Sequence, residues 1–549
     1  MTSCELPKVK SSHIRTWSNF YDRSFPHTKL SLHNPQLEST KPDVLQICER
    51  AVWKKAADFF TNSRFSLFTF IHPVVVRQGT LADCYFLSSL CSLAKWPLRI
   101  QRLFTESESE ESYTVSVFMN GINKKIMVDD FFVYDSLISG SPFSKPYMNQ
   151  IWVQVLEKAW AKVNGSFTNL EFGEEIEALE FLTGAPVDCY IHHTPRITSE
   201  KLWSKICFAC LKNYVIACST KKEKADNSIK KSGLMPFHVY SLLYAKEFRG
   251  GKKVLILRDP WQKTLWKGSL PKEFKDEFDE IDDPDTFAMT LEEYLQYFKE
   301  TTVCKYEDNF VHSTVVVANT EEASFTFEVK NDIKKGYISI HQDHYRLHRL
   351  EDKNYTYSPI YLILGRISSG KVWYITSFVT AWLNTEHRKV SLPPGKYIVF
   401  TGATWNKSCV QKYTVHLYAE EQIEFQEAWY DMKLLVEIGK SFAQINKKFW
   451  KKFGEEFYHF DRIDVDLGFG IRFIKNVSEE QVSYEDSMNY TGLIQLWPKG
   501  EDKDKEVNVL KSGEEHIIIY KFSSPRTYTY DFKYKQVHKD KVSLTLEVI

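Results

Sequence analysis

A loop that runs straight into an apolar helix places one cysteine at the start of that helix. Residues 77–83 (RQGTLAD) lead into Cys84, and an apolar run then continues to Ala94. Asp83 stands at the position of a helix N-cap, so Cys84 is expected in the first helical turn. There the positive end of the helix dipole and the unpaired N–H groups stabilise a thiolate.

Gln78 lies six residues before this cysteine, on the glycine-containing loop. Its amide N–H can turn toward the same point and serve as an oxyanion donor. The alternative is that Cys84 is only a small apolar residue of a core helix. Partners further along the chain decide between the two.

The size and composition predict a globular protein of several domains. At 549 residues the chain is too long for one hydrophobic core, and we expect three or four domains. Lys plus Arg and Asp plus Glu both number 71, so no net field steers the chain toward nucleic acid. Aromatic residues make up 15% of the chain, which favours β-rich packing.

The cysteines predict a reducing environment. All 10 are scattered without the spacing of a disulfide framework. The first residues are polar and charged, and no apolar run approaches 18 residues, so we expect no secretory signal and no transmembrane segment. A cytoplasmic protein with free thiols is the expectation.

Two helices are predicted after the cysteine. Residues 150–163 carry apolar side chains on one face, and Glu157, Lys158 and Lys162 are expected on the exposed opposite face. Residues 174–181 begin another helix, which Gly184 ends.

A predicted hairpin carries a histidine and an aspartate. Two strand-like runs, 237–245 and 253–258, flank a glycine-containing turn. A hairpin centred between residues 248 and 249 places His238 directly opposite Asp259. Pro260 then breaks the ladder and frees the Asp259 side chain. The order cysteine, histidine, aspartate along the chain is that of papain-type thiol proteases.

The second half of the chain is predicted to be β-rich. Evenly spaced strand-like segments favour a sandwich over residues 307–424, and they cover 314–318, 324–329, 336–341, 359–365, 371–378, 389–392, 396–401 and 412–418. Residues 425–549 are expected to begin with helical elements, such as 440–453, and to continue as a second β-rich domain.

Residues 51–306 resemble the protease core of the calpain family. The resemblance is carried by ordered motifs: Gln78-Gly79 with Asp83-Cys84, Val128-Asp129-Asp130, the run from Trp152 to Ser166, Glu177-Ala178-Leu179, Cys218-Ser219, His238 with Tyr240-Ser241, Arg258-Asp259-Pro260-Trp261, and Trp266-Lys267-Gly268. The segment from Val390 to Tyr397 is similar to the calpain β-sandwich domain.

This resemblance implies an α+β protease core followed by a β-sandwich, while the polar, non-periodic residues 1–50 predict an extended arm and the strand spacing alone predicts the β-rich region 425–549. An N-terminal arm (1–50) precedes a two-lobed papain-like protease core (51–306, with lobes of about 51–175 and 176–306). One or two antiparallel β-sandwich domains follow, over 307–424 and 425–549.

The resemblance also implies a role for each of five residues. Cys84 is the nucleophile, and His238 is its general base and later its acid. Asp259 replaces the family's asparagine, and Gln78 donates to the oxyanion. Trp261 shields the histidine–aspartate contact from water. The thiolate attacks a peptide carbonyl to give an acyl-enzyme, which water releases.

Several positions depart from the family pattern. Ala82 replaces a glycine beside the nucleophile, and Tyr85 replaces a tryptophan after it. Phe237 replaces a glycine before the histidine, where we expect it to crowd the substrate cleft. The charge of Asp259 favours the imidazolium form of its neighbour.

The calcium ligands of the family are replaced by other side chains at four positions, Val75, Gln150, Leu265 and Lys272. An acidic run of Asp282, Asp283 and Asp285 remains, and it is expected to be a solvated loop. A hard cation needs anionic oxygens. We therefore expect no metal cofactor and no calcium activation of the core.

The sequence thus favours an intracellular calpain-like cysteine endopeptidase that performs limited proteolysis without core calcium. Protein substrates, and no nucleic acid, are the expected partners. The alternative is a catalytically inactive calpain-like scaffold, which the β domains hold in a protein assembly. Ala82, Phe237 and the replaced calcium ligands motivate that alternative.

Overall fold

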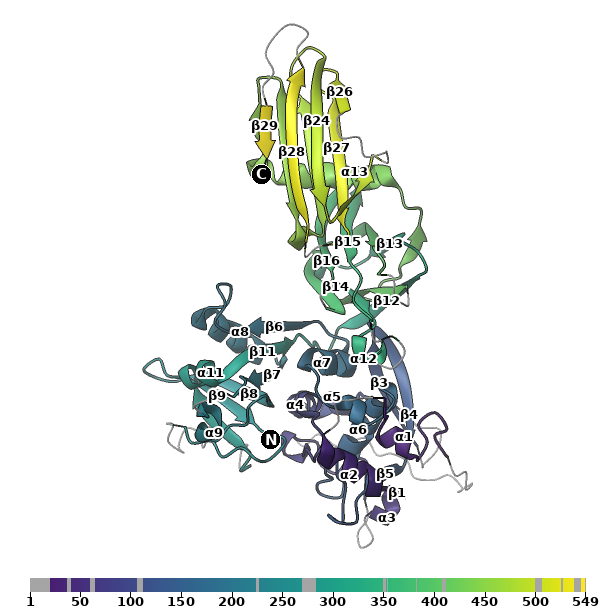
Figure 1. Ribbon diagram of the computed structural model, residues 1–549, viewed down its shortest axis with the longest axis vertical. Helices are drawn as coiled ribbons and strands as arrows, with labels where there is room; N and C mark the ends of the chain where they lie inside the picture. Colours follow the sequence, from purple (N-terminus) through teal and green to yellow (C-terminus); the bar gives the residue numbers. More distant parts are fainter. Residues whose placement is uncertain are drawn as a thin grey trace.

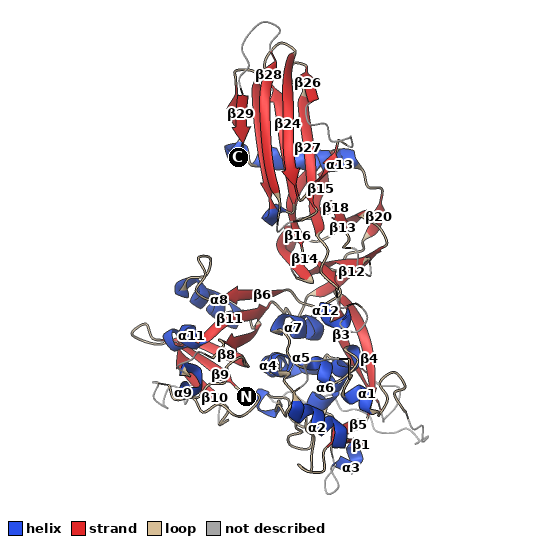
Figure 2. Ribbon diagram, viewed as in Figure 1, coloured by secondary structure: helices blue, strands red, loops and turns tan. Residues whose placement is uncertain are grey.

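The computed structural model describes residues 20–36, 41–59, 65–105, 112–223, 227–268, 283–348, 352, 354–381, 383–406, 411–498, 506–524, 527–537 and 545–548. Its first half mixes helices with short sheets (Figure 1). Its second half consists mainly of long antiparallel strands that rise as a column from the first half (Figure 2). Over the described residues, every helix is too short or too polar to cross a membrane.

Helix α4 (Cys84–Leu93) forms the centre of the first half. Nine of its ten residues are buried, because helices and a sheet surround it. The surrounding elements are α5 (Pro97–Gln101), α6 (Trp152–Val163), α7 (Glu175–Thr183) and the sheet of β2 (Phe104–Thr105), β3 (Ser112–Met119) and β4 (Ile122–Asp129). The predicted start of α4 is confirmed, and a turn at Asn120-Gly121 joins β3 to β4.

The N-terminal segment is helical where an extended arm was expected. It contains α1 (Lys29–Leu32) and α2 (Pro42–Arg50), and β1 (Val52–Lys55) and α3 (Ala56–Phe59) follow. Val44, Ile47 and Cys48 of α2 are buried in the same core as α4. Strand β1 pairs with β5 (Phe131–Tyr134). The described residues between 20 and 50 therefore belong to the folded body.

A six-stranded sheet lies on the other side of α4. One of its faces adds Val215, Ala217 and Val239 to the core around α4. Its opposite face packs under α8 (Ser199–Leu211) and α11 (Leu291–Tyr297). The strands run in the order β10 (Thr286–Thr290), β9 (Lys253–Arg258), β8 (Val239–Glu247), β7 (Val215–Thr220), β11 (Phe298–Cys304) and β6 (Val187–Ile191), and the short helix α9 (Ser228–Ser232) precedes β8.

Polar side chains on α4 join the helix to this sheet. Ser88 Oγ donates to the Val239 carbonyl at 2.7 Å, and Ser92 Oγ donates to the Ile216 carbonyl at 2.7 Å. Lys95, just past the helix, donates to the Leu243 carbonyl at 2.6 Å. These three polar residues lie one helical turn apart, so they form one stripe facing the sheet. The start of α4 is thereby held beside the start of β8.

The predicted register of the histidine-bearing hairpin is wrong. Ser241 pairs with Arg258 and Glu247 with Lys253, and a bulge lies between Leu242 and Tyr244. A direct cross-strand pair of His238 with Asp259 therefore does not form. The two residues instead lie outside the paired strands at the same end of the hairpin, where their side chains still meet.

The polar face of α6 is buried, although the sequence predicted it to be exposed. Glu157 is 2% and Lys158 0% exposed. Lys158 forms an ion pair with Asp129 and donates to the Phe131 carbonyl at 2.6 Å. Lys162 reaches Asp22 at 2.7 Å. Buried charges must be paired, and these partners come from the segments that wrap α6.

Two antiparallel sheets form the predicted sandwich, and all eight predicted strands are present. One sheet runs β12 (Val311–Ala318), β19 (Lys412–Ala419), β14 (Ile333–Gln342) and β17 (Thr385–Leu392). The other runs β16 (Lys371–Thr380), β15 (Ile360–Ser368), β18 (Gly395–Ala403), β13 (Glu322–Val329) and β20 (Gln426–Ala428). Their inner faces share one apolar core.

The last part of the chain packs on the outer face of that second sheet. Helix α13 (Met432–Ile445) begins and ends earlier than the predicted 440–453. It is covered by a sheet of β21 (Lys451–Phe453), β22 (Phe457–Asp464), β23 (Phe469–Asn476), β27 (Glu515–Phe522) and β25 (Leu493–Trp497). A further sheet contains β26 (Glu506–Leu510), β24 (Val482–Thr491), β28 (Thr529–Val537) and β29 (Thr545–Val548).

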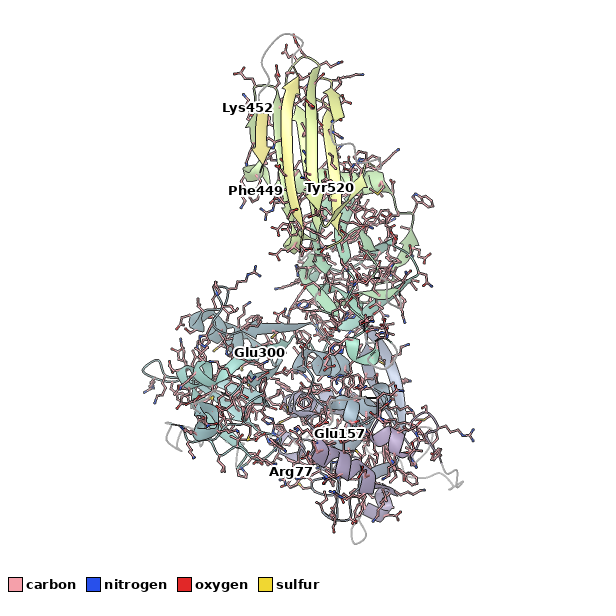
Figure 3. The ribbon with its side chains drawn as sticks, in the orientation of Figure 1. Arg77, Glu157, Glu300, Phe449, Lys452 and Tyr520 are labelled. Carbon is pink, nitrogen blue, oxygen red and sulfur yellow. The ribbon has the colours of Figure 1, made fainter. Side chains whose placement is uncertain are left out.

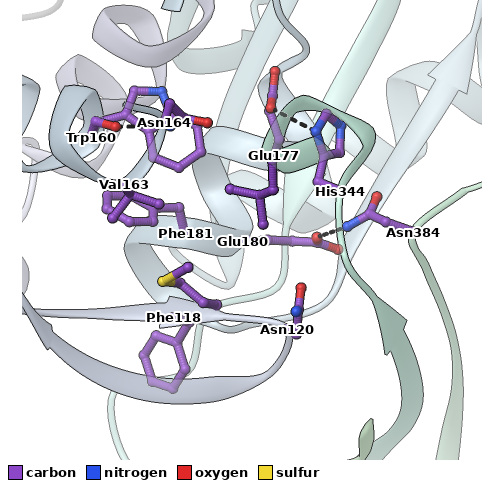
Figure 4. A pocket seen from close by; sticks show the side chains of 12 residues that line it. Phe118, Asn120, Trp160, Val163, Asn164, Glu177, Glu180, Phe181, His344 and Asn384 are labelled. Atoms are coloured by element: carbon purple, nitrogen blue, oxygen red, sulfur yellow. Dashed lines mark hydrogen bonds and ion pairs between the residues drawn. The ribbon is translucent and has the colours of Figure 1, made fainter. Parts of the chain in front are cut away.

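Helix α7 and the sandwich meet around a small cavity near α12 (Tyr345–His348). Glu177 contacts His344 at 3.3 Å and also forms an ion pair with Arg346 at 2.6 Å. Glu180 accepts a hydrogen bond from Asn384 at 3.1 Å (Figure 4). Polar groups thus tie the two halves together at this contact.

The tip of the β3–β4 hairpin docks against histidines of the sandwich. Gly121 approaches the His341 ring so closely that a Cβ would lie 2.9 Å from it. His341 and His416 both hydrogen-bond to Ser339, and His312 lies 3.0 Å from His416. Burial lowers the pKa of His341 to about 3 and that of His312 to about 4. The docked tip therefore rests on neutral imidazoles.

This histidine cluster makes stability sensitive to acid. The unfolded chain binds protons at these histidines below about pH 6.5, whereas the folded chain does so only near pH 3 to 4. The free energy of unfolding therefore falls as the pH falls through this window. In denaturant titrations at pH 7 and 4.5, His341→Gln is expected to lose about 2 kcal/mol less than the unsubstituted chain. Equal losses in both chains would refute this assignment.

Candidate active site

Cys84 occupies the first position of α4 and is half-buried. Asp83 is at the N-cap, as predicted, but its side chain makes no capping hydrogen bond. Tyr85, the next residue, is fully buried, and its hydroxyl accepts a hydrogen bond from Trp160 at 3.1 Å. The tyrosine therefore points into the core and leaves the sulfur at the helix mouth unobstructed by its ring.

His238 and Asp259 lie against each other close to this cysteine. His238 Nε2 is 2.7 Å from Asp259 Oδ1, and the two side chains are 5% and 0% exposed. Cys84 also lies close enough to His238 for its charge to act on the pKa of the imidazole. Because Nε2 is taken by the carboxylate, Nδ1 is the ring nitrogen left for the sulfur. The structure thus brings together the three residues that the sequence singled out.

The charges of these side chains shift the pKa values of their neighbours toward the ionised forms. Burial acts to lower the pKa of His238, but the Cys84 thiolate and then the Asp259 carboxylate raise it to about 10. Burial acts to raise the pKa of Asp259, but the His238 charge lowers it to about 2. The imidazole is therefore protonated at neutral pH and paired with the ionised carboxylate of Asp259.

The Asp259 carboxylate is saturated with hydrogen bonds. Oδ1 accepts from the Trp261 N–H at 2.8 Å in addition to His238. Oδ2 accepts from the N–H groups of Lys263 at 3.1 Å and Thr264 at 3.0 Å, and from the Thr264 hydroxyl at 2.8 Å. Three donors converge on Oδ2, where an asparagine would present an NH₂ group. This loop is therefore built for an aspartate.

Trp261 covers the histidine and joins the two sides of the site. Its ring centroid lies 5.6 Å from that of His238. Its indole N–H donates to the Gly79 carbonyl at 3.0 Å, and the Gln78 N–H donates to the Pro260 carbonyl at 2.8 Å. The loop before Cys84 is thus fastened to the loop after Asp259.

Gln78 lies beside the cysteine loop and is 3% exposed. Its amide N–H donates to the Leu81 carbonyl at 2.7 Å, and a longer contact of 3.5 Å reaches Asp83 Oδ1. No donor among the described residues reaches its carbonyl oxygen. The side chain is therefore held by its own loop, and the oxyanion role stays a prediction.

Two aromatic residues in left-handed backbone conformations stand next to the site. Phe237 precedes His238, has φ of 51° and is 65% exposed. Phe172 has φ of 58°, is 52% exposed and donates its N–H to the carbonyl of Ala82 at 3.0 Å. Such backbone strain in non-glycine residues is concentrated at functional sites.

The positions of the expected calcium ligands are occupied differently. Val75 is buried in the core, and Leu265 is 75% exposed. Gln150 is buried, and its side-chain oxygen accepts from the N–H groups of Thr69 at 3.2 Å and Phe70 at 3.1 Å. Lys272 and Asp282 lie outside the described residues. Across the part of the chain that the structure describes, no cluster of acidic, histidine or cysteine side chains is arranged to hold a metal ion.

The acidic run does not form the expected solvated loop where it is described. Asp283 is 6% exposed and forms an ion pair of 2.7 Å with Arg258. Arg258 also donates to the carbonyls of Val76 at 3.0 Å and Val74 at 3.2 Å. Arg258 was not among the predicted site residues. The one sequence signal for such a role was its position: Arg258 is a charged residue that directly follows the apolar residues 254–257 and precedes Asp259.

A thiol, an imidazole and a buried carboxylate in this order on a mixed α and β fold are typical of a cysteine protease. The family model described as "Calpain family cysteine protease" matches residues 20–305, which is just over half of the chain. The chain belongs to this family. The match begins within the segment that was predicted to be an N-terminal arm.

Similar proteins include plant and animal calpains. The calpain-type cysteine protease ADL1 of Oryza sativa subsp. japonica is 30% identical over 262 residues, which cover 46% of this chain and 12% of that protein. Human calpain-14 is 27% identical over 313 residues, covering 53% of this chain and 43% of that protein. The calpain-1 catalytic subunit of Sus scrofa is 24% identical over 328 residues, covering 55% and 44%. The chain thus matches less than half the length of each of these relatives.

Because hydrogen-bond donors surround the Asp259 carboxylate, replacing it with asparagine, the residue that the family has at this position, is expected to destabilise the fold. Asp259→Asn places an NH₂ group against three donors, so it is expected to lower the free energy of unfolding by about 3 kcal/mol. The matched control is Asp285→Asn in the same region, where one side-chain donor reaches the carboxylate. That control is expected to cost less than about 1 kcal/mol. Equal costs in denaturant titrations would contradict the argument.

Proposed function

We propose that this chain is a cysteine endopeptidase that uses Cys84 as nucleophile and His238 as general base and acid. Asp259 orients the imidazole, and Gln78 turns one amide N–H toward the oxyanion once substrate is bound. The observation that carries the proposal is the contact of His238 with both Cys84 and Asp259 in one group of side chains.

The charge distribution supports this mechanism. A protonated His238 beside Cys84 favours a thiolate–imidazolium pair, which supplies a nucleophile at neutral pH. Attack of the thiolate on a peptide carbonyl gives a tetrahedral oxyanion. The imidazolium then passes its proton to the leaving amine as the C–N bond breaks. Water, activated by the neutral imidazole, releases the acyl group and restores the thiol.

Calcium-independent assembly of the site is part of the proposal. Arg258 donates to carbonyls of the segment leading to Gln78 and pairs with Asp283, so a protein cation joins the two sides. The loop around Thr69 is held by the Gln150 amide oxygen. Neither contact requires a bound metal ion.

We further propose the domain division and setting that the sequence predicts. The two-lobed protease core covers 51–306, with the described part of residues 20–50 packed onto it, and cleaves extended protein segments laid across the cleft. The β-rich regions 307–424 and 425–549 bind assembly partners. Free cysteines among the described residues support action in the cytoplasm, where thiols stay reduced.

An inactive calpain-like scaffold is the second candidate function. The specific observation in its favour is the exposed, left-handed Phe237 next to His238. A bulky side chain at this position reduces the room for a substrate backbone. In that case the geometry around Cys84 serves folding, and the β-rich regions carry the function.

A peptide carrying a thiol-reactive electrophile distinguishes the two functions. Labelling at Cys84 is expected to be stoichiometric, and His238→Ala is expected to slow it by about 10²–10⁴-fold because the thiolate is lost. Cys84→Ala should abolish both labelling and peptide cleavage. Cys207→Ala is the matched control, because Cys207 is also half-buried but lies on α8. Labelling of Cys84 no faster than Cys207, with no cleavage, would support the scaffold.

Cleavage is expected to persist without calcium. The rate in excess chelator should lie within about twofold of the rate in millimolar calcium, because hard cations need anionic oxygens that the expected positions lack. The control is a calcium-activated calpain assayed in parallel with the same peptide. A rate that rises tenfold or more on adding calcium to this chain would refute this part of the proposal.

A further inference from the structure

Two buried carboxyl groups lie directly behind the nucleophile. Asp83 precedes Cys84 and is 0% exposed, and Glu157 on α6 is 2% exposed. The two side chains lie close enough for each to act on the pKa of the other. Figure 3 shows Glu157 within the helical first half of the molecule. No step of the mechanism above uses either group.

The donors around Glu157 require it to be the ionised partner. Ser144 donates its backbone N–H at 3.0 Å to Oε1 and at 3.1 Å to Oε2, and its hydroxyl donates to Oε2 at 2.5 Å. A carboxylate accepts these hydrogen bonds, and it has capacity for one more.

Asp83 has the opposite environment. No donor among the described residues reaches its Oδ2, although the atom is buried. Two carboxylates in contact repel, whereas a proton on Asp83 satisfies both groups by donating to Glu157. Burial raises the pKa of Asp83 well above its usual range, and the Glu157 and Cys84 charges act in the same direction. The proton of the pair therefore resides on Asp83.

The pair also fixes the loop that carries Gln78. Asp83 Oδ1 lies 3.5 Å from the Gln78 amide nitrogen. Ser144, held by Glu157, follows Phe143, and a Cβ at Gly79 would lie 1.9 Å from the Phe143 carbonyl oxygen. Only glycine allows this close approach, so the 142–145 segment braces the loop from behind. Thr80 donates to the Pro142 carbonyl at 2.8 Å, which adds to this brace.

We propose that Asp83 and Glu157 form a proton-sharing carboxyl pair that positions the Gln78 loop and keeps negative charge away from Cys84. The proton neutralises Asp83, the carboxyl next to the thiolate in the chain, and the negative charge is carried by Glu157 on α6. Both are positioning residues, because they act through Ser144, Gln78 and Cys84. The proposal rests on the proposed nucleophilic role of Cys84.

The charged and titratable groups that face the pair are few. Cys84 and the buried Tyr85 interact with Asp83, and His238 faces Cys84 from the sheet side. Ser144 is the other group whose hydrogen bonds act on Glu157. Burial raises the pKa of Glu157 to about 7, so the pair takes up a second proton below that pH. The Cys84–His238 pair then loses a fixed negative neighbour.

The substitutions Glu157→Gln and Asp83→Asn distinguish an electrostatic role of the pair from a role in packing alone. In Glu157→Gln the single carbonyl oxygen cannot serve both Ser144 and the proton of Asp83. Asp83 then ionises against the new amide N–H, and its charge lies beside the thiolate. In Asp83→Asn the amide N–H reproduces the proton donated to Glu157, and the amide oxygen still faces Gln78.

The test is the rate of iodoacetamide alkylation at Cys84 between pH 5 and 9, measured by peptide mass spectrometry on the full chain. Glu157→Gln is expected to move the pH midpoint upward by about one unit, because a negative charge beside a thiolate disfavours it. Asp83→Asn is expected to keep the midpoint of the unsubstituted chain. The control is Glu180→Gln, a half-buried glutamate on α7 whose pKa is likewise raised by desolvation to about 7.

A midpoint unchanged in Glu157→Gln, or moved equally in Asp83→Asn, would overturn the proposal. If Glu157→Gln does not fold, Asp83→Asn decides alone: an unchanged midpoint supports the pair, and an upward move of a unit contradicts it. The alkylation readout does not need turnover. A chain that alkylates selectively at Cys84 but cleaves no peptide would refute the peptidase and still test the pair.

Discussion

The candidate active site depends on the packing of α4 against β7 and β8 of the six-stranded sheet. Ser88 and Ser92 donate to sheet carbonyls, and Ser241 donates back to the Ser88 carbonyl at 2.8 Å. Apolar side chains fill the space around these hydrogen bonds. A helix held only by apolar contacts can slide or rotate, whereas directional hydrogen bonds fix its position along the sheet. The thiol at the start of the helix is thereby fixed relative to the imidazole before β8.

The surroundings of Asp259, His238 and Asp83 then determine the protonation state of each side chain. Asp259 is saturated with donors and stays ionised, so it holds His238 protonated. On the other side of the thiol, Asp83 faces a carboxylate, and no donor among the described residues reaches its Oδ2, so we propose that it stays neutral. The two aspartates nearest the nucleophile therefore have opposite protonation states, because one is surrounded by donors and the other is not. In this proposal the carboxyl group next to the imidazole is charged, whereas the carboxyl group next to the thiol in the chain is neutral and the charge lies further back, on Glu157.

The sequence predicted those elements whose pattern is local. The start of α4, helix α7 and the eight sandwich strands all follow from capping and alternation rules. Features set by tertiary contacts could not be predicted in this way. The hairpin turns around Gly250 rather than between residues 248 and 249, which changed its register, and partners on distant segments buried Glu157 and Lys158. The contact of His238 with Asp259 was nevertheless predicted correctly, because both residues lie at the same end of the hairpin in either register.

The separation of the Cys84 sulfur from His238 Nδ1 tests the central claim most directly. A crystal structure of the full chain, without ligand and in the presence of a chelator, measures it. We predict a separation of about 3–4 Å, which allows proton transfer, with His238 Nε2 hydrogen-bonded to Asp259. A separation of about twice that value, or a ring turned so that Nδ1 faces away from the sulfur, would contradict it.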